Sequence, residues 1–256
     1  MTDRAPSQEH LAELYDAFNP WGPSDDFYQK LVMSAEAVLD VGCGTGALLH
    51  SAREAGHTGR LCGLDPDEAM LSRARRRSDI EWVLSDAASA NWDREFDLVV
   101  MASHAFQVFV EDDDLRASLA AIRSALIDGG RFAFETRNPL VRAWEQWTPD
   151  NAFEVVDAAG AVVRVEYEVE TPVVGDVVCF SETFTSPAWN RPHVERASLR
   201  FLDLSSLSSF LADAGLVIEE RFGDWSRQPL TDTSPEIITL ARRGLARRVV
   251  AGRVRP

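Results

Sequence analysis

Residues 37–56, AVLDVGCGTGALLHSAREAG, combine a short apolar run with three closely spaced glycines and a helical pattern. The apolar run ends at Asp40, and Gly42, Gly44 and Gly46 follow before the helical periodicity begins. This order predicts a strand, a tight turn and a helix. Such a turn points free backbone N–H groups and the positive end of a helix dipole at a ligand, and glycine lets that ligand approach the main chain. The stretch therefore predicts a nucleotide-type binding site.

The acidic residue before the glycines bears on which nucleotide binds. The spacing Gly42-x-Gly44-x-x-Ala47 also fits the dinucleotide fingerprint of nicotinamide-dependent oxidoreductases. A carboxylate at Asp40 repels a pyrophosphate but can help to order the loop and an amino group of the ligand. The run Asp40-x-Gly42-x-Gly44-x-Gly46 resembles motif I of the class I S-adenosylmethionine-dependent methyltransferases. The resemblance implies S-adenosyl-L-methionine as cofactor and methyl transfer as activity, with an NAD(P)-dependent oxidoreductase as the alternative.

The amino-acid composition limits which classes of partner the protein can bind. The 256 residues carry 41 acidic and 26 basic side chains, a formal net charge of -15, which argues against a nucleic-acid partner. The cysteines and histidines show no metal-ligand spacing, so we expect no metal. No apolar run approaches the ~20 residues that span a bilayer, and we expect a cytoplasmic protein without a membrane partner.

Acidic residues follow the next two predicted strands. Residues 60–64 form a strand that ends at Asp65, where a carboxylate can accept hydrogen bonds from both ribose hydroxyls, and Pro66 opens the next helix. Residues 80–84 form a third strand, followed by Asp86. The resemblance implies that Asp86 accepts a hydrogen bond from the adenine amino group; the alternative is a surface turn residue.

Strand and helix patterns continue to alternate after this point. Residues 96–101 predict a fourth strand, and the helix that starts at Asp112 is expected to end at Asp128-Gly129-Gly130, before a fifth strand over residues 131–136. Two closing strands are predicted over residues 216–222 and 237–241. The fold class is therefore α/β, a Rossmann-like seven-stranded mostly parallel sheet of the class I methyltransferase type with an antiparallel β insertion.

The insertion is predicted where the helical period disappears. Residues 145–200 alternate apolar and polar side chains between turn signals, and we interpret them as an antiparallel cap that selects the substrate. The S-adenosylmethionine-binding core then comprises residues 1–144 and 201–241, with an N-terminal helical lid, and residues 242–256 form a basic C-terminal tail.

The resemblance implies a set of cofactor-binding residues, of which the lid aromatics Tyr15 and Trp21 could equally pack on the core. The full set is Tyr15, Trp21, Asp40, Gly42, Gly44, Gly46, Asp65, Pro66, Met70, Asp86, Ala87 and Ala102.

Catalytic and substrate-binding candidates follow the fourth and fifth strands. Ligands of open α/β sheets bind outside the carboxyl ends of the strands, which places His104 near the reacting methyl as a candidate general base. Glu135 is a second catalytic candidate, and His104, Phe106, Arg137 and Trp144 are candidates for contact with the substrate. His104 could instead be a loop histidine without a catalytic role. Glu135 and Arg137 could form an ion pair with each other or with the insertion, and Trp144 could belong to the core of the insertion.

Together these patterns predict a methyltransferase that acts on an N or O atom of a small molecule. A cofactor-binding regulatory protein without catalysis remains an alternative, and a homodimer is left open.

Overall fold

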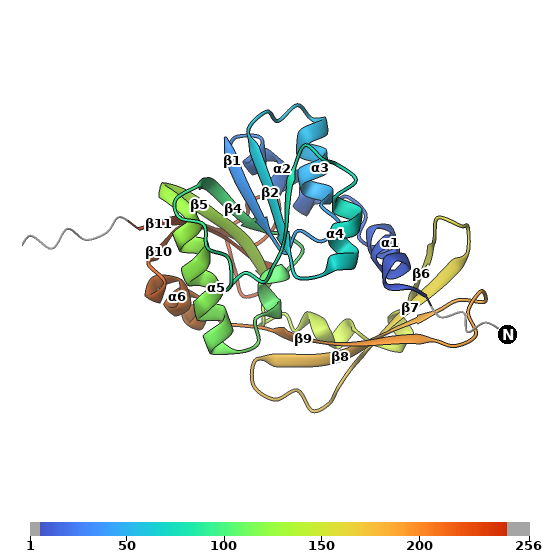
Figure 1. Ribbon diagram of the computed structural model, residues 1–256. Coiled ribbons are helices and arrows are strands. Elements are labelled where there is room, and N and C mark those ends of the chain that lie inside the picture. Colours follow the sequence, from blue (N-terminus) through green and yellow to red (C-terminus); the bar gives the residue numbers. More distant parts are fainter. Residues whose placement is uncertain (1–5, 245–256) are drawn as a thin grey trace, which may run out of the picture.

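The computed structural model describes residues 6–244, and its centre is a seven-stranded sheet (Figure 1). The strands are β1 (Ala37–Val41), β2 (Arg60–Asp65), β3 (Glu81–Leu84), β4 (Phe96–Met101), β5 (Leu126–Arg137), β10 (Leu216–Phe222) and β11 (Glu236–Arg243). Their order is β10-β11-β5-β4-β1-β2-β3, and the ladders from β3 to β5 are all parallel. Only β11 is reversed within this sheet, because it pairs antiparallel with both neighbours. The predicted Rossmann-like α/β fold is confirmed.

Helices bury apolar side chains against both faces of this sheet. They are α2 (Pro23–Val32), α3 (Ala47–Glu54), α4 (Glu68–Ala74), α5 (Asp112–Ala125) and α6 (Leu204–Asp213). Helices α5 and α6 share one apolar cluster with Phe132 and Phe134 of β5, whereas α2 and α3 share a second cluster with Val38 of β1 and Val100 of β4. The central parallel strands are thus buried on both faces, which explains their continuous apolar sequences.

A second sheet stands apart from the first. It has four antiparallel strands in chain order, β6 (Phe153–Val156), β7 (Val162–Val169), β8 (Val177–Thr185) and β9 (His193–Arg200). The N-terminal helix α1 (Gln8–Phe18) lies against this sheet (Figure 1). Leu11 and Leu14 of α1 share an apolar cluster with Val163, Val165 and Phe184 of the sheet. The insertion therefore has no closed core of its own and depends on α1 to cover it.

The end of α5 differs from the sequence prediction. The helix stops at Ala125, and β5 begins at Leu126, so Asp128-Gly129-Gly130 lies in a strand with a register shift instead of ending the helix. The guanidinium of Arg243 supplies the missing cap, because its Nη1 donates hydrogen bonds to the carbonyls of Arg123, Ser124 and Leu126 at 2.8, 3.1 and 2.6 Å. A distant arginine thus satisfies the carbonyls that a helix end leaves open.

Strand β11 includes two residues that the prediction assigned to the basic tail. Arg242 and Arg243 are its last residues, whereas residues 245–256 lie outside the described part of the chain.

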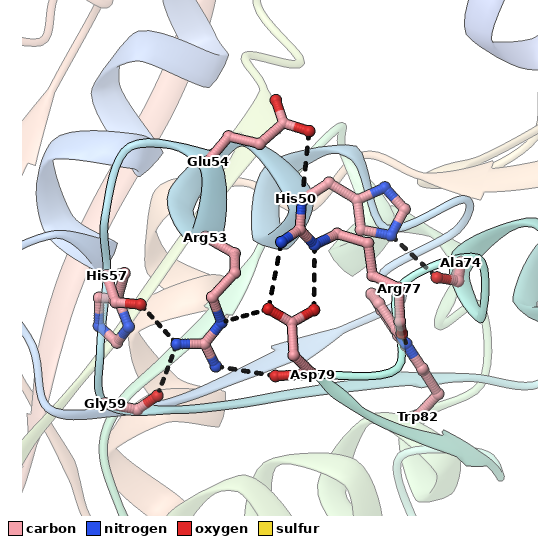
Figure 2. Close-up of polar contacts among 9 residues, drawn as sticks. All are labelled: His50, Arg53, Glu54, His57, Gly59, Ala74, Arg77, Asp79 and Trp82. Carbon is pink, nitrogen blue, oxygen red and sulfur yellow. Dashed lines mark hydrogen bonds and ion pairs between the residues drawn. The ribbon is translucent and has the colours of Figure 1, made fainter.

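Polar contacts fix the connections around α3 (Figure 2). The guanidinium of Arg53 donates hydrogen bonds to the carbonyls of His57, Gly59 and Asp79, and so ties the end of α3 to the segments before β2 and β3. The carboxylate of Asp79 also accepts hydrogen bonds from Arg77 at 3.1 Å. The network therefore lies at the amino ends of β2 and β3, whereas the glycine turn lies at the carboxyl end of β1.

No helix between residues 6 and 244 is long and apolar enough to cross a membrane. The same part of the chain holds no group of three or more His, Cys, Asp or Glu side chains placed to bind a metal ion. All three cysteines are free thiols.

Candidate functional site

The turn after β1 is built from three glycines in the left-handed region. Gly42, Gly44 and Gly46 have φ of 76°, 53° and 78°, values that residues with a Cβ rarely adopt. At Gly46, which begins α3, an added Cβ would lie 2.4 Å from Cη2 of Trp82. A larger residue there would have to displace the indole ring as well as adopt a strained backbone. The glycine pattern of the sequence therefore has a steric cause.

Asp65, at the end of β2, holds this turn. One carboxylate oxygen accepts a hydrogen bond from the N–H of Gly44 at 2.8 Å, and the other accepts one from the N–H of Asp67 at 2.9 Å. Burial raises the pKa of Asp65, and these two hydrogen bonds oppose that rise. Because a carboxylate oxygen has two lone pairs, Asp65 can still accept hydrogen bonds from a ligand.

Beside the turn lies a cavity of about 490 Å³, which we call the loop cavity. It opens at the carboxyl ends of β1, β2 and β4, the edge at which ligands of open α/β sheets bind. Sequence-predicted residues form much of its wall, namely Tyr15, Gly42, Asp65, Pro66, Asp86, Ala87, Ala102, His104 and Arg137. Asp86 is exposed, and its carboxylate accepts hydrogen bonds from the N–H and hydroxyl of Ser89 at 2.7 and 3.0 Å.

The other predicted residues lie outside that wall. Gly44 and Gly46 shape the turn, and Met70 of α4 lines a different cavity, described below. Trp21 is 43% exposed, and its Nε1 donates a hydrogen bond to Asp26 at 2.8 Å. Phe106 is buried in the core and stacks on Phe134, with ring centroids 4.3 Å apart.

Asp40 is buried near the carboxyl end of β1, and the charges of two other acidic side chains, Asp65 and Glu135, act on it. Burial, and then the charges of Asp65 and Glu135, raise the pKa of Asp40 to about 7. A buried carboxylate without a counter-ion is costly, so this end of the sheet favours a ligand that brings positive charge.

His104 sits on a turn held by buried groups. It has φ 60°, and its backbone N–H donates a hydrogen bond to Oε1 of Glu135 at 2.7 Å, while the hydroxyl of Tyr28 donates to Oε2. Its ring Nε2 lies 3.0 Å from Oε2 of Glu236, the first residue of β11. Glu135 therefore shapes the turn, whereas Glu236 orients the imidazole.

Arg137 ends β5 and does not pair with Glu135. Its Nη1 donates a hydrogen bond to Oε1 of Gln107 at 3.1 Å, and its guanidinium lies 5.2 Å from the ring centroid of Trp147, in the segment before β6. Burial lowers the pKa of Arg137, and Glu236 and Glu135 oppose that change. Trp144 packs instead on Phe201, with ring centroids 4.5 Å apart, and lines neither the loop cavity nor the second cavity described below.

A second cavity of about 440 Å³, the insertion cavity, lies between α1 and the four-stranded sheet. Its wall includes Met70, Trp147, Tyr167 and Glu182. Four residues line both cavities, namely Tyr15, Ser103, Arg137 and Leu199. The two cavities therefore adjoin across these side chains.

Helix α1 is fastened to the loop side through Asp16. One carboxylate oxygen accepts a hydrogen bond from the hydroxyl of Thr45, in the glycine turn, at 2.5 Å. The other accepts one from Nη2 of Arg73, on α4, at 3.1 Å. Burial raises the pKa of the neighbouring Tyr15, and its hydrogen bond with Ser103 opposes that rise. The helix thus contacts the turn, α4 and the insertion at once.

Sequence reasoning missed Tyr28, Gln107, Glu182 and Glu236. Of these four, Glu236 alone could have been predicted from the sequence. It stands directly before an apolar strand, whereas the predicted acids Asp65 and Asp86 follow apolar strands. Since β11 runs in the opposite direction, the start of this strand meets the same edge of the sheet, in register with Arg137.

Comparisons with known proteins agree with this geometry. A family model described as "Methyltransferase domain" matches residues 38–130. The 2-phytyl-1,4-naphtoquinone methyltransferase of Thermosynechococcus vestitus is 32% identical over 154 residues, covering 54% of this chain and 67% of that protein. The chain spans about half the length of two further curated relatives.

Solved structures resemble the chain over almost its whole length. A S-adenosylmethionine-dependent methyltransferase from Clostridium acetobutylicum gives a TM-score of 0.73 at 20% identity, covering 92% of this chain and 98% of that one. The S-adenosylmethionine-bound amino pentose methyltransferase from Micromonospora echinaspora gives 0.67 at 20% identity, covering 95% and 100%. At this identity the likeness shows the fold alone.

Proposed function

The chain belongs to the class I S-adenosylmethionine-dependent methyltransferase family, and we propose that it transfers the methyl group of S-adenosylmethionine to an N or O atom of a small molecule. The observation that carries the proposal is the junction of the two cavities at Tyr15, Ser103, Arg137 and Leu199. Methyl transfer from a sulfonium needs the donor and the nucleophile side by side with water excluded. The loop cavity would take the donor and the insertion cavity the acceptor.

The residues around the loop cavity fit S-adenosylmethionine. Asp65 and Asp86 offer carboxylate oxygens to ribose hydroxyls and to an adenine amino group. The cofactor carries an ammonium and a sulfonium, and Asp40 makes this edge of the sheet favourable for positive charge. When bound, the cofactor supplies an activated methyl group, so the protein needs no metal for the transfer itself.

The chain's own contribution is alignment and proton removal. His104 lines the loop cavity next to Ser103, which lines both cavities, and the Glu236 carboxylate 3.0 Å from Nε2 fixes the ring. An imidazole in this place can accept the proton that an O–H or N–H nucleophile releases. Arg137 lines both cavities and can orient an electron-rich group of the acceptor toward the methyl.

The size of the insertion cavity and the charge of the protein support a small acceptor. A cavity of about 440 Å³ holds a molecule of metabolite size. The net charge of -15 disfavours nucleic acid as the substrate. Relatives named for a quinone and for an amino pentose are consistent with this class of acceptor.

Calorimetric titration of the full chain tests the proposal. S-adenosylmethionine and S-adenosylhomocysteine should each bind with micromolar affinity, and NAD should give no heat. Incubation with S-adenosylmethionine and a small-molecule extract should then produce a compound heavier by one methyl group, detected by mass spectrometry. Binding of NAD alone would overturn the donor assignment, and cofactor binding without any methylated product would favour a regulatory protein.

A further inference from the structure

The insertion sheet carries an acidic row in the wall of the insertion cavity. Tyr167 of β7, Glu182 of β8 and Glu195 of β9 are directly paired across the three strands. All three side chains line the insertion cavity, and none lines the loop cavity. The row therefore lies on the part of the acceptor site that belongs to the insertion alone.

Glu182 is the central member of this row. Its Oε1 accepts a hydrogen bond from the hydroxyl of Tyr167 at 2.8 Å. Burial raises the pKa of Glu182, and the charge of Glu195 raises it further, although the Tyr167 hydrogen bond opposes the rise. Like charges directly opposite each other on neighbouring strands destabilise a sheet. A cation bound at Glu182 would relieve both the burial and the repulsion.

Glu195 is the more exposed of the two acids and has a partner outside the cavity wall. Its Oε1 lies 3.0 Å from Nε2 of His193, two residues earlier on the same strand. The side chains that shift the pKa of Glu182 are Tyr167 and Glu195, and neither is basic. Of the two carboxylates, Glu182 is thus better placed to take a ligand as its counter-ion.

Aromatic rings surround this acid. Trp147 lies 5.0 Å from Phe180 and 6.4 Å from Tyr167, measured between ring centroids. Phe184 of the sheet and two aromatic residues of α1 also line the cavity. Aromatic faces attract cations, and most strongly where water is excluded. A carboxylate among aromatic rings is the chemistry that recognises an ammonium group.

The positive side chain of the cavity, Arg137, lies 5.2 Å from the ring centroid of Trp147 but is ion-paired with neither Glu182 nor Glu195. Arg137 lies at the junction with the loop cavity, where it binds Gln107 and feels the charges of Glu236 and Glu135. Three carboxylates line the insertion cavity: Glu182 and Glu195 lie on the insertion sheet, whereas Asp67 caps α4 by accepting hydrogen bonds from the N–H groups of Ala69 and Met70.

Building on the function proposed above, we propose that the methyl acceptor is an amine whose ammonium group binds at Glu182, beside Glu195 and among the aromatic rings of the insertion cavity. This ammonium anchors the molecule at the insertion sheet. The electron-rich group that receives the methyl then points toward Ser103 and Arg137, where the two cavities meet.

Three probes of matched shape test the charge preference. The full chain, saturated with S-adenosylhomocysteine, is titrated calorimetrically with 4-phenylbutylamine, 4-phenylbutanol and 4-phenylbutanoate. The amine should bind about tenfold more tightly than the alcohol, and the carboxylate should bind most weakly, since a partly buried carboxylate prefers an ammonium to a neutral or anionic group.

Two variants locate the preference. Glu182→Gln keeps an oxygen for the Tyr167 hydroxyl but loses the charge, so amine affinity should fall to that of the alcohol while alcohol affinity stays the same. Glu168→Gln is the matched control, because Glu168 lies one residue from Tyr167 on β7, is exposed and does not line the insertion cavity. It removes the same charge from the same sheet and should leave the preference unchanged.

Other outcomes would overturn the inference. Equal affinity for amine and alcohol, no amine binding at millimolar concentration, or an unchanged preference in Glu182→Gln would each remove the ammonium site. The preceding titration with S-adenosylhomocysteine separates this failure from failure of the proposed function. A protein that binds S-adenosylhomocysteine but shows no amine preference would keep its methyltransferase assignment and lose only the amine acceptor.

Discussion

The loop cavity and the insertion cavity share four residues but are built in different ways. Around the loop cavity, short turns at the ends of parallel strands place polar groups, and backbone hydrogen bonds hold them, as Asp65 is held by Gly44 and Asp67. Around the insertion cavity, side chains from α1, α4 and the second sheet meet without any shared turn. The first is set by local sequence and backbone geometry, and the second by the docking of distant elements.

This difference predicts where substitutions act. Changes on the loop side should affect the cofactor and the backbone that holds it, whereas changes at Glu182 and Glu195 of the insertion sheet should affect only the choice of acceptor.

The largest effect should come from crowding the loop side. Gly46→Ala should lower the free energy of unfolding by about 3 kcal/mol, because the new Cβ combines left-handed strain with a clash against Trp82. Gly56→Ala is the matched control, since Gly56 also has positive φ but open space around its Cβ position, and it should cost only about 1 kcal/mol. Urea denaturation measures both. Equal losses would mean that the indole ring moves aside freely.

Removal of the His104 imidazole from the wall of the loop cavity should have the next largest effect. His104→Ala should reduce turnover about a hundredfold if the imidazole removes a proton, with little change in cofactor affinity. Glu236→Gln leaves the imidazole in place without its carboxylate partner, so its effect should be smaller, about tenfold. Steady-state kinetics with S-adenosylmethionine and an acceptor that the protein methylates measure both values. A loss of only a few fold in His104→Ala would leave alignment as the main source of catalysis.

Asp65→Ala should weaken cofactor binding by about 2 kcal/mol, or about thirtyfold, since ribose hydroxyls and two backbone N–H groups lose an acceptor. Asp86→Ala should cost less, because Asp86 is exposed and water can replace it. Calorimetry with S-adenosylhomocysteine provides the comparison. Unchanged affinity in Asp65→Ala would contradict the ribose assignment.

The last prediction concerns pH, and it is a gradual slope instead of a single loss. A carboxyl whose pKa rises from about 4 in the unfolded chain to about 7 in the native protein keeps its proton on folding. The unfolded state then binds fewer protons, so the contribution of Asp40 to stability falls as pH rises from 4 to 7, by at most about 1.4 kcal/mol per pH unit.

Asp40→Asn should flatten this fall, as measured by urea denaturation at several pH values. Asp86→Asn is the control, because hydrogen bonds from Ser89 lower the pKa of Asp86 and its contribution is lost only as pH falls below the usual carboxyl range. An unchanged slope in Asp40→Asn would show that Asp40 is ionised throughout.

The same contrast explains what the sequence could predict. The glycine turn and the acids near the ends of β1 and β2 follow from residues close together in the chain. Together with the alternation of strands and helices, they carried the family resemblance from which the fold class was predicted. The acidic row in the insertion depends on strand register, which places Tyr167, Glu182 and Glu195 side by side on three consecutive strands. No local pattern encodes that pairing.

Two features of the core escaped prediction for the same reason. The end of α5 is set by Arg243, about 120 residues later in the chain, and not by the nearby glycines. The buried Tyr28 looks like any aromatic residue of an amphipathic helix until β5 brings Glu135 beside its hydroxyl. Long-range partners of this kind become visible only in the folded molecule.

Helix α1 limits how this protein can acquire new substrates. This helix lines the insertion cavity, reaches the loop cavity through Tyr15 and holds the glycine turn through Asp16, so a substitution at Tyr15 that admits a different acceptor also changes the cofactor side. Positions 182 and 195 on β8 and β9 face only the insertion cavity. Acceptor specificity can therefore change through positions 182 and 195 without altering the cofactor site, whereas α1 is constrained by its contacts with both cavities.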